Sequence, residues 1–181
     1  REACRQAAAW QGQGLPPLVM AVNLSALQFK RGSLILTVAE ALAETGLAPE
    51  HLELELTESI LIKDTENVLQ TVQALRGMGI RLSVDDFGTG YSSLAYLKRF
   101  AVHKLKIDRS FVHNMADNPD DAAIVRAIIQ MARSLNLSTI AEGVEDPRLP
   151  DLLRQQGCTE AQGFLFARPL PAADLARRLE Q

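Results

Sequence analysis

Short apolar segments of strand length alternate with amphipathic, helix-like segments about six times along this chain. The clearest strand patterns, at 52–57, 80–85 and 103–108, place mostly leucine, isoleucine or valine at every second position and polar residues between them. The clearest helical pattern, at 33–45, carries one apolar stripe and is followed by Gly46 as a C-cap. Neighbouring parallel strands need a helix-length crossover, so the alternation predicts parallel strands, arranged as a doubly wound sheet or as a (β/α) barrel.

The rest of the chain continues the same alternation. Further strands are expected at 18–24, 138–142 and 159–166, and further helices at 1–10, 64–77, 92–99, 119–135, 146–157 and 171–179. The longest of these helices begins at Asn118-Pro119, because proline suits the first helical position, and its expected buried stripe is Ile124, Ile128, Met131 and Leu135. The sequence shows no repeat, linker or low-complexity segment, so we expect one domain.

The composition limits the partners and the location that we expect. Of 181 residues 47% are hydrophobic, enough for one domain with a sizeable core. The net charge of −3, with acids and bases interspersed, argues against duplex nucleic acid and against direct contact with an anionic membrane. Cys4 and Cys158 have no metal-ligand spacing and are interpreted as buried thiols of a reducing compartment. No apolar run reaches the roughly 18 residues of a membrane span, so we expect a cytoplasmic domain, which leaves open an anchor elsewhere in a longer parent protein.

Polar residues gather at the carboxyl ends of the expected strands. They are Asn23, Glu55, Asp85, Asp86, Lys106, Asp108, Glu142 and Gln162. In a parallel barrel these strand ends form one rim, which is the face that holds active sites, whereas a doubly wound sheet would spread them along an edge. The number of charged groups at these positions therefore favours the barrel.

The chemistry of this set favours a metal site. Carboxylate and amide oxygens without histidine or cysteine suit hard cations, Mg²⁺ or Mn²⁺ before zinc. Two such ions can clamp the attacking and leaving oxygens of a phosphodiester displacement, with Asp85 shared between them and Lys106 orienting the water or balancing phosphoryl charge. Each residue also has a simpler interpretation: Lys106 as a salt-bridge partner of Asp108, Asn23 as a turn residue and Gln162 as a surface amide.

Asp85 and Asp86 are followed at once by a glycine-rich turn. Neighbouring strand residues point to opposite faces, so both carboxylates reach one site only if the backbone begins to turn, which Gly88 and Gly90 permit. An ordinary loop between a strand and a helix is the alternative. Two adjacent like charges cost Coulomb energy unless a cation compensates them, and this favours the metal site.

The run DDFGTGYSSL at 85–94 resembles loop 6 of the EAL domain, the family of cyclic di-GMP phosphodiesterases. Further motifs of that family occur in order along the chain: NLS at 23–25, ELTE at 55–58, KID at 106–108, AEGVE at 141–145 and AQGF at 161–164. The resemblance implies a (β/α)8 TIM-like barrel, of which residues 1–181 hold about six βα units and lack the N-terminal strands with the Glu-Ala-Leu motif.

The resemblance also implies roles for individual residues. The implied metal ligands for Mg²⁺ or Mn²⁺ are Asn23, Glu55, Asp85, Asp86, Glu142 and Gln162. The implied catalytic residues are Lys106, Glu142 and Glu58, with Glu58 anchoring loop 6. The implied substrate-binding residues are Asp108, Ser25, Arg168 and Pro169. The implied reaction is hydrolysis of one phosphodiester of cyclic di-GMP, which gives linear pGpG.

The segment upstream of Arg1 decides between an enzyme and a receptor. The family's Glu-Ala-Leu segment supplies a metal-binding Glu and a phosphate-binding Arg, and without them we expect the 181-residue chain alone to be inactive. The alternative is a degenerate EAL domain that binds cyclic di-GMP without cleaving it, and a purely structural interaction module is a third interpretation. The family further implies a homodimer through the helix near 91–100 and a sensory or GGDEF-type domain upstream in the parent protein.

Overall fold

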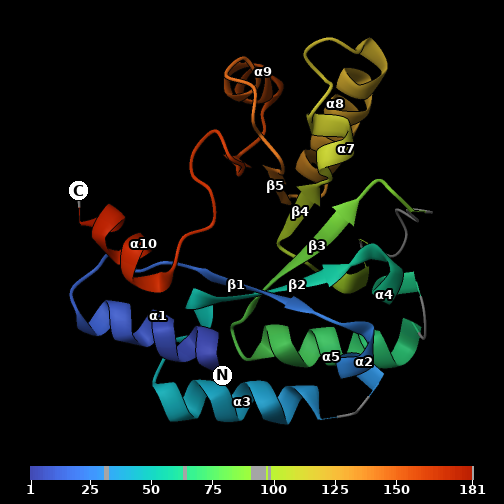
Figure 1. Ribbon diagram of the computed structural model, residues 1–181. Coiled ribbons are helices and arrows are strands. Elements are labelled where there is room, and N and C mark those ends of the chain that lie inside the picture. Colours follow the sequence, from blue (N-terminus) through green and yellow to red (C-terminus); the bar gives the residue numbers. More distant parts are fainter. Residues whose placement is uncertain (31–32, 63–64, 91–96, 98, 181) are drawn as a thin grey trace. The chain divides into compact units, whose positions relative to one another are not determined.

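The computed structural model describes residues 1–180 except 31–32, 63–64, 91–96 and 98. Within the described residues, parallel strands form one six-stranded sheet in the order β1-β2-β3-β4-β5-β6, which is also their order in the sequence (Figure 1). In a doubly wound sheet the order reverses at a switch point, whereas in a barrel it follows the sequence. The expected α/β fold, an incomplete (β/α)8 TIM-like barrel, is confirmed.

The chain divides into two compact units, and each is described separately. The first unit comprises Arg1–Leu56, Ile60–Leu82 and Pro169–Gln181, and the second comprises Thr57–Ser59 and Ser83–Arg168. The elements of the first unit are α1 (Glu2–Gly12), β1 (Met20–Leu24), α2 (Ala26–Lys30), α3 (Leu34–Thr45), η1 (Pro49–His51), β2 (Leu52–Thr57), α5 (Thr65–Gly77) and α10 (Ala172–Leu179), β2 ending at the first residue of the second unit.

In the first unit β1 and β2 pair in parallel, with helices packed beside them. Helix α1 packs against β1 and α3, and α3 packs against α5 (Figure 1). Leu52, Leu54 and Leu56 of β2 are at most 2% exposed, and Glu53, which alternates with them, is only 3% exposed. Both faces of β2 are therefore covered, as in the strands of a parallel barrel.

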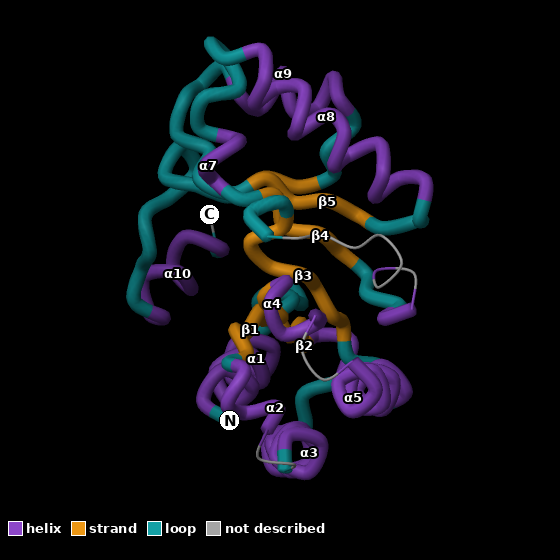
Figure 2. The backbone as a smooth tube through the Cα atoms, turned by 90° about the vertical axis from the view of Figure 1, so that its right-hand side faces the viewer, coloured by secondary structure: helices purple, strands orange, loops and turns teal. Residues whose placement is uncertain are grey.

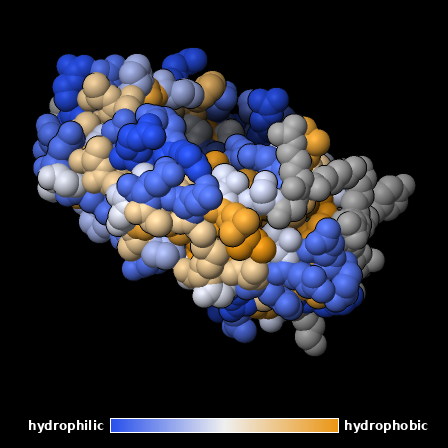
Figure 3. All heavy atoms as spheres, turned by 90° about the horizontal axis from the view of Figure 1, so that it is seen from below, coloured by the Kyte–Doolittle hydropathy of each residue, from blue (hydrophilic) through white to orange (hydrophobic). Residues whose placement is uncertain are grey.

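Seen from below, apolar side chains form a band between charged and polar ones (Figure 3). Among the described residues of the first unit, the large apolar ones that are exposed are Val19, Leu27, Leu36 and Leu170. Gly46 ends α3 in the left-handed conformation (φ 69°), the C-cap that the sequence predicts.

The second unit carries the remaining elements. They are β3 (Arg81–Phe87), β4 (Lys104–Ile107), α7 (Arg109–Val112), α8 (Pro119–Ser134), β5 (Ser138–Ala141), α9 (Leu149–Gln156) and β6 (Glu160–Ala161). The first two residues of β3 belong to the first unit, as does most of α4 (Glu58–Ile62). Figure 2 shows α8 lying alongside β4 and β5, against which it packs. The side chain of Asn118 accepts a hydrogen bond from the Asp120 amide, so the predicted start of α8 is confirmed.

The predicted buried stripe of α8 is partly wrong. The structure buries Val125, Ile128, Ile129 and Ala132, whereas Ile124 is 38% exposed. Two apolar stripes overlap on this helix and share Ile128. Periodicity alone does not choose between them, and packing on β4 and β5 selects the second.

Some expected boundaries also differ from the structure. Strand β6 covers two residues instead of 159–166, because the chain turns at Gly163 to pass against Val144. Helix α9 begins at Leu149 rather than at 146, and Pro150 lies in its first turn as expected. The expected helix at 92–99 and the proposed dimer contact near 91–100 fall largely on 91–96 and 98, outside the described residues.

Arg148 joins the loop before α9 to the loop before α8. Its guanidinium binds both carboxylate oxygens of Asp117 (2.9 and 2.8 Å) and the carboxylate of Asp146 (2.6 Å at the shortest). These hydrogen bonds hold the pKa values of both aspartates below their usual range and raise the pKa of Arg148. We call these three residues the Arg148 clamp.

Both cysteines are free thiols, as the sequence predicts. Cys4 is buried as expected, whereas Cys158 is only half-buried, so its expected full burial is wrong. Across the described residues, no helix combines the length and the apolar character that crossing a membrane requires.

Candidate active site

The second unit gathers four of the predicted residues on the strands β3 to β6. The ammonium group of Lys106 lies 2.8 Å from Asp85 Oδ1 and 2.8 Å from Glu142 Oε1. The side-chain amide of Gln162 donates to the same Glu142 oxygen at 3.0 Å. Lys106 is only 5% exposed, so its charge is compensated mainly by these carboxylates rather than by water. Lys106 thus forms ion pairs with the carboxylates of Asp85 and Glu142.

The backbone fixes where these side chains emerge. Lys106 lies between Leu105 and Ile107, which are both fully buried. The amide of Glu142 donates to the Ile107 carbonyl (3.1 Å), and the amide of Gln162 donates to the Ala141 carbonyl (2.9 Å). Glu142 and Gln162 thus directly follow the ends of β5 and β6, and Lys106 is the last residue but one of β4, so all three lie at carboxyl ends of strands as the sequence predicts.

Asp85 and Asp86 both reach this site because β3 contains a bulge. Val84 pairs with Leu105 and Phe87 with Ile107, so the two aspartates together lie opposite the single residue Lys106. Asp86 adopts a positive φ of 53° to do so. The backbone thus turns here as expected: the turn begins at Asp86, and Gly88 (φ 101°) continues it.

The oxygens of Asp85, Asp86 and Glu142 lie within 4.8 Å of one another, and we call these residues the acidic cluster. Partial burial and the neighbouring carboxyls of Asp85 and Asp108 raise the pKa of Asp86. Three converging carboxylates, without nitrogen or sulfur donors, fit a hard divalent cation such as Mg²⁺ or Mn²⁺.

Glu58 lies at the start of α4 and contacts the loop that follows β3. Its Oε2 atom accepts a hydrogen bond from the Gly88 amide (3.4 Å), and it is 7% exposed. A Cβ atom at Gly90 would lie 3.2 Å from the Glu58 carboxylate, so this loop approaches the side chain closely. The contact agrees with the anchoring role that the family resemblance implies.

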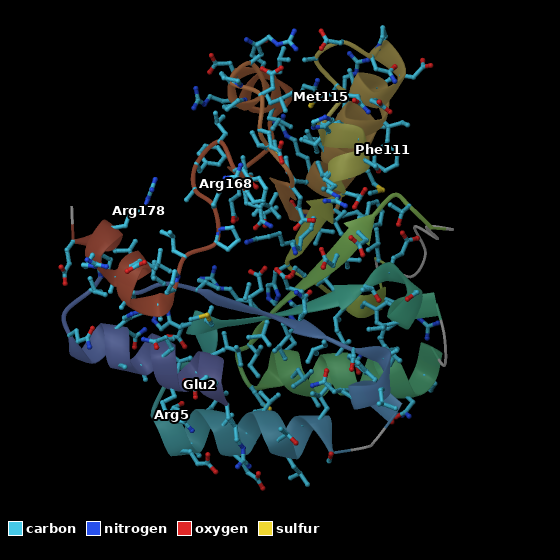
Figure 4. All side chains as sticks on the ribbon, in the orientation of Figure 1. Glu2, Arg5, Phe111, Met115, Arg168 and Arg178 are labelled. Atoms are coloured by element: carbon cyan, nitrogen blue, oxygen red, sulfur yellow. The ribbon has the colours of Figure 1, made fainter. Side chains whose placement is uncertain are left out.

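The predicted substrate-binding residues lie in different places. In the second unit Asp108 caps α7 by accepting from the Ser110 amide at 2.9 Å, and the Arg168 guanidinium lies 4.8 Å from the centre of the Phe164 ring. Arg168 lies in the segment that leads from β6 to α10 (Figure 4). In the first unit Ser25 binds Gln28 just before α2, and Pro169 precedes α10.

In the first unit, the predicted metal ligands Asn23 and Glu55 are direct partners in the β1–β2 register. Paired residues of adjacent strands have neighbouring Cβ atoms, so the amide and the carboxylate emerge side by side. Asn23 is exposed and Glu55 is 7% exposed.

Two features of the second unit were missed by sequence reasoning. One is a pocket of about 380 Å³ lined by Arg109, Ser110, His113, Asn114, Gly143 and Glu145. The other is an ion pair between Lys104 and Glu160 (2.8 Å). Both depend on contacts between segments distant in the sequence, and alternation along one strand does not reveal such contacts.

The fold and these motifs define a domain of a known family. The model of the EAL domain matches residues 1–169, and this chain therefore belongs to the EAL domain family.

Named relatives and solved structures agree. The chain is 49% identical over 174 residues to the bifunctional diguanylate cyclase/cyclic di-GMP phosphodiesterase MucR of Pseudomonas aeruginosa, covering 96% of this chain and 25% of MucR. The solved complex of the PaMucR phosphodiesterase with c-di-GMP has a TM-score of 0.92 at 49% identity, covering 96% of this chain and 70% of that one. The manganese/c-di-GMP complex of Klebsiella pneumoniae BlrP1 has a TM-score of 0.82 at 31% identity, covering 93% and 43%. The chain spans about a quarter or less of the length of the curated relatives it matches.

Proposed function

We propose that this chain is the catalytic region of a metal-dependent phosphodiesterase that hydrolyses one phosphodiester of cyclic di-GMP to linear pGpG. The observation that carries the proposal is the bulge in β3, which sets Asp85 and Asp86 opposite Lys106 while Glu142 binds the same ammonium group. The solved c-di-GMP complexes of PaMucR and BlrP1 support the substrate.

We assign metal binding to the acidic cluster, with Gln162 holding Glu142 in place. Asn23 and Glu55 are the further ligands that the family resemblance implies, and their register supports a joint role. Bound Mg²⁺ or Mn²⁺ would lower the pKa of a water molecule and stabilise charge on phosphoryl oxygens. The manganese in the BlrP1 complex supports this choice of cation.

The chain's own residues prepare the site for the attacking water. Lys106 carries a charge that two carboxylates hold in place, so its ammonium group can donate to a water or to a phosphoryl oxygen as negative charge develops. Lys106 and Gln162 both bind Glu142 Oε1, which restricts rotation of that carboxylate. Such pre-organisation costs no rearrangement during the reaction.

Glu58 acts on the loop rather than on the substrate. By accepting from the Gly88 amide it holds the backbone that follows the two aspartates, and we propose that it keeps loop 6 in its working conformation. We further propose that Asp108, Ser25, Arg168 and Pro169 contact cyclic di-GMP. A guanidinium group such as that of Arg168 suits a phosphate oxygen.

The pocket beside Glu142 is the candidate site for one guanine base. It is lined by Glu145 and Arg109, and a Cβ atom at Gly143 would lie 2.6 Å from the Arg109 Cβ atom, so the absence of a side chain at Gly143 lets these two parts of the wall approach each other. A carboxylate such as that of Glu145 can accept hydrogen bonds from the amino group that distinguishes guanine from adenine.

The proposal extends to the parent protein. A homodimer, a cytoplasmic location and an upstream sensory or GGDEF-type domain are what the family resemblance implies. The bifunctional name of MucR, of which this chain covers a quarter, supports the upstream domain.

The test uses the chain extended upstream to include the family's Glu-Ala-Leu segment. We expect this protein to convert cyclic di-GMP to pGpG with Mn²⁺, and Asp85→Asn to abolish the product. The matched control is Asp151→Asn, the same chemical change on the exposed surface of α9, and it should leave turnover unaltered. If the protein binds the dinucleotide but forms no product with either Mg²⁺ or Mn²⁺, the chain is a receptor for cyclic di-GMP and the proposal of an enzyme is wrong.

A further inference from the structure

A second lysine–carboxylate pair lies on the same strands as the site. Lys104 precedes Lys106 by two residues on β4, so both lysines share one face of that strand, and Lys106 and Glu160 are both register partners of Ile140 on β5. The Lys104 ammonium lies 2.8 Å from Glu160 Oε2. The face that carries the acidic cluster thus carries two ammonium groups, each bound to carboxylates.

The second pair spans one intervening strand. Lys104 is opposite Ser138 in the register of β4 and β5, and Glu160 is opposite Ile140 in that of β5 and β6. The Glu160 side chain therefore reaches diagonally across β5 to Lys104. The Lys104 side chain is only 13% exposed and that of Glu160 is 46% exposed, so Glu160 supplies a carboxylate to an ammonium group that water scarcely reaches.

We propose that Glu160 sets the divalent-cation affinity of the acidic cluster by compensating the charge of Lys104. This inference rests on the proposed metal site. The positive charge of Lys104 near that site repels a divalent cation, and the negative charge of Glu160 offsets this repulsion. Glu160 acts through Lys104 and does not touch the reacting atoms, so it is a tuning residue and not a catalytic one.

The size of the effect follows from Coulomb's law. Successive residues advance roughly 3.3 Å along a strand, so Lys104 starts roughly 6.6 Å from Lys106, and its ammonium lies on the order of 10 Å from a cation in the cluster. A unit charge at that distance from a divalent ion, in a dielectric close to that of water, changes its dissociation constant about fivefold. The exposure of Glu160 keeps the effect at this modest size.

The experiment is a Mn²⁺ titration of the upstream-extended protein, with free Mn²⁺ followed by electron paramagnetic resonance. Glu160→Gln keeps an oxygen that can accept from Lys104 and removes only the charge, and it should raise the Mn²⁺ dissociation constant about fivefold. Lys104→Met should lower that constant by a similar factor. The double variant should bind within about twofold of the wild type, because both charges are gone.

The signs separate this role from a structural one. If the ion pair only held β4 and β6 together, both single variants would weaken Mn²⁺ binding and the double variant would be no better than either, which would overturn the inference. The expected shifts should shrink as the ionic strength rises, and shifts that do not respond to salt would also contradict it. Asp151→Asn, an equal charge change on the exposed surface of α9, should leave the constant unaltered, and melting curves should show that every variant is folded.

Failure of the inference and failure of the proposed function give different results. An upstream-extended wild-type protein that binds no Mn²⁺ would refute the proposed metal site and this inference with it. If the wild-type protein binds Mn²⁺ but Glu160→Gln and Lys104→Met do not shift the dissociation constant in opposite directions, only the role of Glu160 is refuted.

Discussion

Replacing Lys106 by methionine tests the electrostatics of the site most severely. Methionine retains most of the length of the side chain and removes the ammonium group that lies 2.8 Å from Asp85 and from Glu142. The lysine side chain is 6% exposed and the two carboxylates are 14% and 16% exposed, so the variant leaves two poorly hydrated negative charges close together. Loss of one member of a buried pair costs about 3 kcal/mol or more.

For a chain of this size, that loss lowers the melting temperature by about 6–12 °C. We expect this shift in the presence of a chelator, measured by calorimetry or circular dichroism. Mn²⁺ should then restore more stability to Lys106→Met than to the wild type, because a divalent cation replaces the missing positive charge; saturation at about 100 times the dissociation constant contributes about 2.7 kcal/mol. A variant that melts within about 2 °C of the wild type in chelator would refute the reasoning, as would one that gains no extra stability from Mn²⁺.

Three further outcomes are expected. Gly163→Ala places a Cβ atom 2.2 Å from the Val144 carbonyl oxygen, so it should cost about 3 kcal/mol in urea unfolding; an unchanged unfolding midpoint would contradict this close approach. Glu58→Ala removes the acceptor of the Gly88 amide and should lower turnover of the upstream-extended protein about 100-fold while the melting temperature changes little; full turnover would exclude the anchoring role. The pKa values of both aspartates in the Arg148 clamp are lowered, so the clamp stabilises the fold above the unfolded carboxyl pKa of about 3.9 and loses this effect as the pH falls through the folded pKa values. Arg148→Met should therefore lower the melting temperature at neutral pH and not in strong acid, and a difference independent of pH would count against the clamp.

The sequence predicted the fold and the convergence of four polar residues because parallel strands impose simple rules. The alternation of apolar and polar residues located the strands. The rule that the carboxyl ends of parallel strands share an edge then selected Asp85, Lys106, Glu142 and Gln162. The structure brings these four together on adjacent strands.

Sequence reasoning failed where local patterns are ambiguous or absent. The helices α2, α4 and α7 are too short to show helical periodicity, and the overlapping stripes of α8 concealed that Ile124 is exposed. The bulge in β3 was missed because the two aspartates fit either the strand or the turn, and only pairing with β4 shows that both lie opposite Lys106.

The most direct test of the account is chromatographic. Cyclic di-GMP is incubated with the upstream-extended protein in Mn²⁺ and, separately, in chelator, and the products are separated and compared with authentic pGpG. The account predicts pGpG with Mn²⁺, none in chelator, and recovery of the product when Mn²⁺ is restored in excess. Equal amounts of pGpG with and without the metal would contradict the metal-dependent mechanism, and a folded protein that binds the dinucleotide but yields no pGpG would contradict the assignment as a phosphodiesterase.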